Sequence, residues 1–145
     1  MKRMCVLAVY LLCLSPVAFT QSAAASLTTK AKYGQASRIT LSGVVDDIQQ
    51  RSLGATCKAL GVFVIVKTNG QSFTLEVGPK WFIDELTWTF TKGDKLEITG
   101  WKGENSNEVV VRKITRGEWI LEPRDDSGTP NWLWMTVPKD SGKCT

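Results

Sequence analysis

GVFVIVKTNGQSFTLEV, residues 61–77, decides the fold of this chain. Two runs of mainly β-branched and aromatic residues flank Asn69-Gly70, a dipeptide typical of two-residue β-hairpin turns. If these two residues form the turn, one side of the hairpin is almost entirely apolar. Its pairs are Val66 with Phe73, Val64 with Leu75 and Val62 with Val77, with Thr68 opposite Gln71 next to the turn. We expect this side to face a core.

The opposite side of the same hairpin is mixed in character. It carries an aromatic ring, an aliphatic side chain, a cation, hydroxyls and a carboxylate. The pairs here are Phe63 with Glu76, Ile65 with Thr74, and Lys67 with Ser72. Because side chains alternate between the two faces of a strand, this mixed side points outward if the apolar side is buried.

Outward from the hairpin, the chain continues to read as short strands. Residues 38–48 (RITLSGVVDDI) alternate with a period of two, and Gly43 suggests a bend or bulge. Residues 49–60 are expected to form a long loop. Residues 79–90 contain apolar residues at helical spacing for one or two turns. Two further strands are expected in KLEITGW and EVVVRKITR, and EWILEP extends the sheet in one interpretation.

These elements predict an all-β domain with one short helix, a five-stranded barrel of the oligonucleotide/oligosaccharide-binding (OB) type, over residues 38–124. Residues 26–37 are expected to form a flexible leader and residues 125–145 a C-terminal tail. Trp132 and Trp134 in this tail either clamp it onto the barrel or form a docking patch for a protein. A β-sandwich is the alternative fold, although sandwiches usually have more strands.

The segments RITLSGVV, GVFVIVKTNGQSFTLEV and GDKLEITG, with GPKWFID and RDDSGTPNW, resemble a group of small exported bacterial OB-fold proteins. These periplasmic proteins are often labelled DNA-binding by fold analogy. The resemblance spans residues 38–134. It implies a small barrel, and it leaves the ligand open because fold alone does not determine function.

Residues 1–25 are predicted to be a secretory signal peptide. Lys2 and Arg3 precede eleven uncharged residues, 4–14, and Ala23-Ala24-Ala25 provides small residues for cleavage. A membrane-spanning helix needs about 20 apolar residues, so an anchor is the weaker interpretation. Cleavage leaves about 120 residues, enough for a core. We therefore expect a periplasmic or secreted protein with no stable membrane span after cleavage.

Two of the four cysteines, Cys57 and Cys144, remain after cleavage. In an oxidising compartment they form a candidate disulfide, with two free thiols as the alternative. Cys13 raises the further alternative of a lipoprotein, but bulky leucines precede it, unlike a good lipobox.

The residue types present argue against most catalytic chemistry. The chain has no histidine, so Ser–His and Cys–His nucleophile pairs, haem attachment and His-ligated zinc are excluded. Asp125-Asp126-Ser127-Gly128 is typical of a turn and lacks the acid spacing of a calcium loop. We expect no metal and no cofactor. A carboxylate-based hydrolase stays an alternative; its candidate acids, Asp46, Asp84, Glu85 and Glu97, are scattered over several elements.

We therefore expect a non-catalytic binding or accessory module that contacts another exported protein or a small polymer. In OB barrels the ligand face is the surface of the second and third strands with the flanking loops. The candidate ligand-binding residues are Phe63, Ile65, Lys67, Thr74, Arg51, Lys58, Trp101 and Lys102.

Single-stranded nucleic acid or an oligosaccharide is an alternative ligand, since a ring with nearby cations suits both. A strong basic excess, typical of dedicated nucleic-acid binders, is lacking: the formal net charge is +4, and two of the cations lie in the signal peptide. In a further alternative, the leader or the tryptophan-rich tail covers Phe63 and Ile65.

Overall fold

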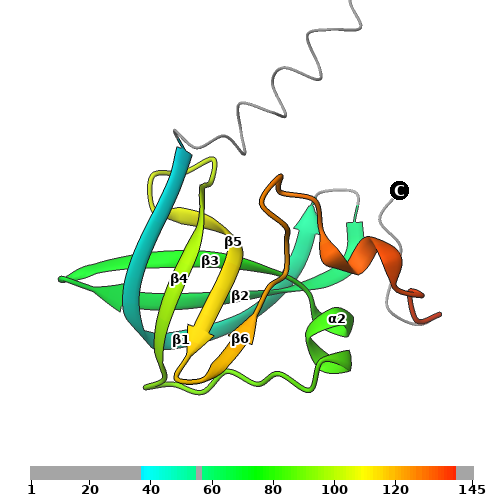
Figure 1. Ribbon diagram of the computed structural model, residues 1–145, viewed down its shortest axis with the longest axis horizontal. Helices are drawn as coiled ribbons and strands as arrows, with labels where there is room; N and C mark the ends of the chain where they lie inside the picture. Colours follow the sequence, from blue (N-terminus) through cyan, green and yellow to red (C-terminus); the bar gives the residue numbers. More distant parts are fainter. Residues whose placement is uncertain (1–36, 55–56, 140–145) are drawn as a thin grey trace, which may run out of the picture.

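The computed structural model describes residues 37–54 and 57–139 (Figure 1). The predicted signal peptide, the leader up to residue 36 and Cys144 lie outside the described residues. The side chains of Cys57 and Lys58 also lie outside them, so the proposed disulfide stays a prediction. No helix in the described ranges is long and apolar enough to cross a membrane.

The hairpin expected at residues 61–77 is formed by β2 (Cys57–Thr68) and β3 (Gln71–Pro79). Asn69 and Gly70 both have positive φ, 48° and 78°, as a type I′ turn requires. The predicted register is confirmed from Thr68↔Gln71 to Phe63↔Glu76. It is wrong at the next pair, because a bulge places Val62 opposite Gly78 instead of Val77. The bulge keeps both valines in the core.

Strand β1 (Arg38–Gly54) is the longest element and belongs to both halves of the fold. Its first part pairs with β4 (Lys95–Lys102) and its second part with β2. A Cβ atom on Gly43 would lie 3.0 Å from the Lys67 carbonyl oxygen, so glycine permits the close approach of β1 and β2. The loop predicted at residues 49–60 is wrong: the β1–β2 ladder continues to Gly54↔Cys57.

The strands close into a ring in the order β1-β2-β3-β5-β4-β1, which confirms the mostly β, OB-like fold class. Closure comes from β5 (Glu108–Arg116), which pairs parallel to β3 over the short ladder Thr74↔Glu108 to Glu76↔Val110. A sixth strand, β6 (Trp119–Leu121), adds to the predicted five and pairs antiparallel with β5.

The core of this ring is dry and aliphatic. The inward residues of the hairpin meet Leu96 and Ile98 from β4. The short helix α2 (Lys80–Glu85) follows Pro79 and buries Phe82 and Ile83 against the same core. The core side chains are Val45, Val62, Val64, Val66, Leu75, Val77, Phe82, Ile83, Leu96, Ile98, Val109, Val111, Ile114 and Leu121.

A buried arginine, Arg124, bridges β3 and β5 at the point where the two strands diverge, which we call the Arg124 seam. Arg124 is 4% exposed, and its Nη1 donates to the carbonyls of Glu76 (3.3 Å), Val77 (3.0 Å) and Val111 (2.9 Å). These carbonyls lie at or just beyond the end of the β3–β5 ladder. Nη2 donates to the Glu76 carboxylate at 2.8 Å. The guanidinium thus supplies hydrogen bonds that a longer ladder would have made.

The residues after the seam fold back onto the barrel. The 3₁₀ helix η2 (Asn131–Trp134) places the Trp132 ring 5.4 Å from the Phe82 ring and 4.9 Å from the Arg124 guanidinium. A Cβ atom on Gly78 would lie 2.8 Å from this indole, so glycine makes room for it. Trp132 therefore clamps the tail, whereas Trp134 is 85% exposed.

Candidate functional site

The outward side of the barrel carries a continuous cross-strand row of five residues. The register pairs Phe63 with Glu76, Glu76 with Val110, Val110 with Trp101, and Trp101 with Arg38. The row therefore runs once around the ring, through all five of its strands. Two of the predicted ligand-binding residues, Phe63 and Trp101, belong to it, but they are separated by Glu76 and Val110.

Both aromatic rings of this row are covered by arginines from β1. The Arg51 guanidinium lies 4.0 Å from the Phe63 ring centroid, and the Arg38 guanidinium lies 5.7 Å from that of Trp101. Phe63 is 7% exposed and Trp101 is 1% exposed. Neither ring offers an open stacking face, contrary to the expectation of an outward aromatic surface. Arg51 of β1 thus covers Phe63. Trp132, which holds the tail, contacts α2 and the end of β3 instead.

A recess of about 290 Å³ lies at the end of this row. Residues of β1, β2, β3 and β5 and of the turn between β4 and β5 line it. Its lining residues are Arg51, Leu53, Phe63, Glu76, Gly103, Glu104, Glu108 and Val110. This is the position where the strand surface and the β4–β5 turn of an OB barrel meet. Of the predicted candidates whose side chains the structure describes, it brings together only Arg51 and Phe63.

Four other predicted ligand-binding residues do not line the recess: Ile65, Lys67, Thr74 and Lys102. The side chain of Lys58 lies outside the described residues. Lys67 is ion-paired with Asp46 at 2.8 Å, and Ile65 is half-buried opposite Thr74. Lys102 is exposed at the end of β4. The structure thus separates these cations from the aromatic ring that they were expected to surround.

Sequence reasoning placed Glu76 opposite Phe63 on the outward side but missed Glu104 and Glu108. These three carboxylates line the recess, and Arg51 is the cation among its described lining residues. Within the described ranges Glu76 is paired with Arg124, while Glu104 and Glu108 form no ion pair. The two unpaired glutamates belong to the polar segment GENSNE, residues 103–108, whose composition indicates only that it is exposed. Its place beside Phe63 depends on the parallel pairing of β3 with β5, which no local pattern indicates.

The sequence model of the MamS/MamX magnetosome protein family matches residues 37–121, more than half of the chain. The chain belongs to this family. No curated protein and no solved structure matches it. The matched range includes every residue of the cross-strand row and of the recess. It ends before the Arg124 seam and the Trp132 clamp of this MamS/MamX family member.

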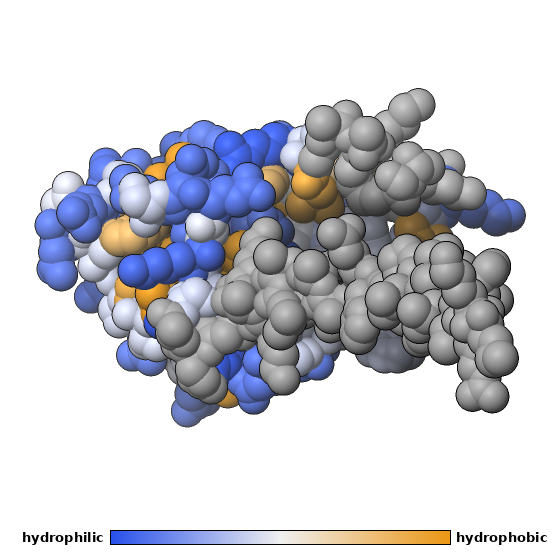
Figure 2. All heavy atoms as spheres, turned by 90° about the horizontal axis from the view of Figure 1, so that it is seen from above, coloured by the Kyte–Doolittle hydropathy of each residue, from blue (hydrophilic) through white to orange (hydrophobic). Residues whose placement is uncertain are grey.

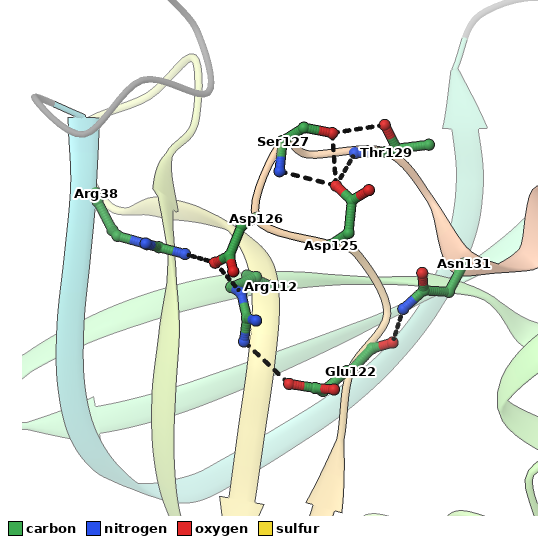
Figure 3. A network of polar contacts seen from close by, with 8 residues as sticks. All are labelled: Arg38, Arg112, Glu122, Asp125, Asp126, Ser127, Thr129 and Asn131. Carbon is green, nitrogen blue, oxygen red and sulfur yellow. Dashed lines mark hydrogen bonds and ion pairs between the residues drawn. The ribbon is translucent and has the colours of Figure 1, made fainter.

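Asp126 organises a polar network on the surface next to the row (Figure 3). Its Oδ1 accepts hydrogen bonds from Arg38 and from Arg112 Nε, the latter at 2.7 Å. Arg112 Nη1 also donates to Glu122 Oε1 at 3.0 Å. The hydrogen bond from Arg38, then that from Arg112, holds the pKa of the Asp126 carboxyl below its usual value of 3.8. This network fixes Arg38 over Trp101 in the MamS/MamX domain.

The neighbouring Asp125 forms the predicted turn. Its Oδ1 accepts from Ser127 N (2.8 Å), Ser127 Oγ (2.6 Å) and Thr129 N (2.9 Å). The Ser127 side chain is the main cause that lowers the pKa of Asp125. No group of three metal-ligating side chains occurs in the part of the chain that the structure describes. Asp125-Asp126 therefore serves local backbone geometry and the arginine network.

We expect Asp126→Asn to make the stability of this MamS/MamX domain less dependent on pH. A carboxyl with a lowered folded pKa stabilises the fold above its unfolded pKa of about 3.9, and this contribution is lost as pH falls through the folded value. The wild type should melt above the variant at neutral pH, and the difference should shrink as the pH falls below the unfolded pKa. Thermal unfolding followed from neutral pH into acid measures it. A constant difference would contradict the assignment.

Proposed function

We propose that this chain is an exported, non-catalytic accessory module of the magnetosome family, active in the periplasm or as a secreted protein. It contacts another exported protein or a small polymer through the recess between Phe63 and the β4–β5 turn. The observation that carries the proposal is this recess, formed where strand surface and turn meet in OB barrels. The resemblance to small exported OB-fold proteins supports the same assignment.

The lining of the recess, in which three of eight residues are glutamates, favours a polar contact over a large apolar interface. The part of the surface visible at the left of Figure 2 is mainly hydrophilic, with hydrophobic side chains only in small separate spots. Interfaces of transient complexes keep a polar rim around a small buried anchor. A recess with Phe63 at its base and carboxylates at its rim fits that pattern.

The alternatives gain less support from the same residues. A nucleic acid brings phosphates toward Glu104 and Glu108, and like charges repel. The acids considered for a hydrolase lie on separate elements: Asp46 on β1, Asp84 and Glu85 on α2, and Glu97 on β4. Two of them already pair with lysines, Asp46 with Lys67 and Asp84 with Lys80.

Site-specific photo-cross-linking tests the proposal. With p-benzoylphenylalanine at position 104, irradiation of cells of the native source should give a defined adduct of the full chain. The matched control is position 118, also an exposed glutamate but in the turn after β5, at the opposite end of that strand. Adducts from position 104 that are absent from position 118 support the recess. Equal adducts at both positions, or none at 104, would overturn it.

A further inference from the structure

The two arginines that cover the aromatic rings are held very differently. Arg38 lies over Trp101 and is fixed by Asp126, which Arg112 also binds. Arg51 lies over Phe63 and forms no ion pair within residues 37–54 and 57–139. The guanidinium of Arg51 is therefore the displaceable one of the two.

The surroundings of Arg51 favour a positive charge over the Phe63 ring. The face of an aromatic ring attracts cations, and carboxylates close to it strengthen that preference. Glu104 and Glu108 line the same recess as Phe63. The exposed Arg51 side chain can move into solvent, so an entering cation does not have to share the Phe63 ring with it.

We propose that the recess takes a lysine or arginine side chain from an extended segment of a partner protein. This cation replaces the Arg51 guanidinium on Phe63 and is held by Glu104 and Glu108, so Arg51 acts as a placeholder that covers the ring in the unbound protein. The proposal rests on the function proposed above and specifies its partner. The charge complementarity of the recess selects a cationic protein segment over an anionic polymer.

Titration of defined peptides tests the proposal on the full chain without its signal peptide. The probes are a hexa-arginine peptide, a hexa-glutamate peptide and a neutral glycine-serine peptide of equal length. Binding is followed by the NMR signals of the Phe63 ring and of the Gly103 and Glu108 amides. Hexa-arginine is expected to shift these signals in a saturable manner at moderate salt, and the other two probes are not.

Charge-removing variants separate a specific site from general attraction. The double variant Glu104→Gln/Glu108→Gln is expected to weaken hexa-arginine binding about tenfold, because the acceptors of the bound cation lose their charge. The matched control Glu85→Gln/Glu118→Gln removes the same charge from exposed positions on α2 and after β5. It should leave the affinity within about twofold.

Replacing Arg51, the placeholder, is expected to increase the affinity for hexa-arginine. Arg51→Ala should bind hexa-arginine several-fold more tightly than the wild type because no internal cation competes for Phe63. Lys102→Ala removes one exposed positive charge from the end of β4 and should change the affinity much less. Phe63→Leu, with amide spectra showing the native fold, should weaken binding.

The outcomes separate this inference from the function on which it rests. Equal gains in Arg51→Ala and Lys102→Ala would overturn the placeholder role. Saturable shifts at the recess with hexa-glutamate or the neutral peptide, and none with hexa-arginine, would overturn the cationic partner and leave the recess as a binding site. The absence of recess shifts with all three probes, together with no specific adduct at position 104, would overturn both.

Discussion

Arg124→Met is expected to lower the free energy of unfolding by about 3–5 kcal/mol, because each buried carbonyl left without a donor costs about 1–3 kcal/mol. The substitution removes the donor for three backbone carbonyls, those of Glu76, Val77 and Val111, where β3 and β5 diverge. It also leaves the Glu76 carboxylate without its cation. Methionine fills much of the space and donates no hydrogen bond, so the loss is mainly polar. Urea unfolding followed by circular dichroism measures it.

Arg112→Met is the matched control for this substitution. Arg112 binds Asp126 and Glu122, whose carboxylates are largely exposed, and such pairs contribute about 0–1 kcal/mol. Its loss should therefore cost far less than that of Arg124. Similar effects of the two variants would contradict the role of Arg124 in closing the barrel.

Trp132→Ala is expected to destabilise the fold by about 2–3 kcal/mol, somewhat below the range for fully buried tryptophans because the side chain is half-buried. The indole contacts the Phe82 ring and the Arg124 guanidinium and lies above Gly78. Its removal opens the contact between the tail and the end of β3. Chemical denaturation of the full chain gives the change.

Trp134→Ala makes the same chemical change two residues along. Because Trp134 is 85% exposed, its removal should alter stability by less than about 0.5 kcal/mol. If Trp134→Ala were as destabilising as Trp132→Ala, the tail would be held by contacts other than the Trp132 clamp.

The central hairpin could be predicted from the sequence because its information is local. Asn69-Gly70 fixes the turn, and the strict alternation of valines fixes which side is buried. The single error, Val62 opposite Val77, comes from a bulge. A bulge leaves the composition of a strand unchanged and shifts only its pairing.

The extended β1–β2 ladder was not predictable in the same way. Residues 49–60 show no clean alternation. Residues 49–54 and 57–60 become strand because β1 and β2 extend through them and pair with each other. For the same reason, the sequence indicated β6 only as a possible extension of the sheet in EWILEP. Elements that exist through tertiary pairing have a weak local pattern.

The candidate site was predicted only in part. Alternation correctly placed Phe63 away from the core cluster, yet the ring is covered by Arg51. Two partners of Phe63 in the recess lie more than forty positions further along the chain: Glu104 in the β4–β5 turn and Glu108 at the start of β5. A sequence pattern indicates which side of a strand a residue occupies. Which residues of distant segments lie next to it depends on how the strands close into a ring.

The Arg124 seam also determines where a minimal domain has to end. A fragment that stops at Leu121 contains all six strands and the whole matched family range. It lacks the guanidinium that satisfies the diverging β3 and β5 carbonyls and the indole above Gly78. Truncation tolerance depends on the burial and hydrogen bonding of what is removed. The folding unit of this chain therefore extends past its last strand, through η2.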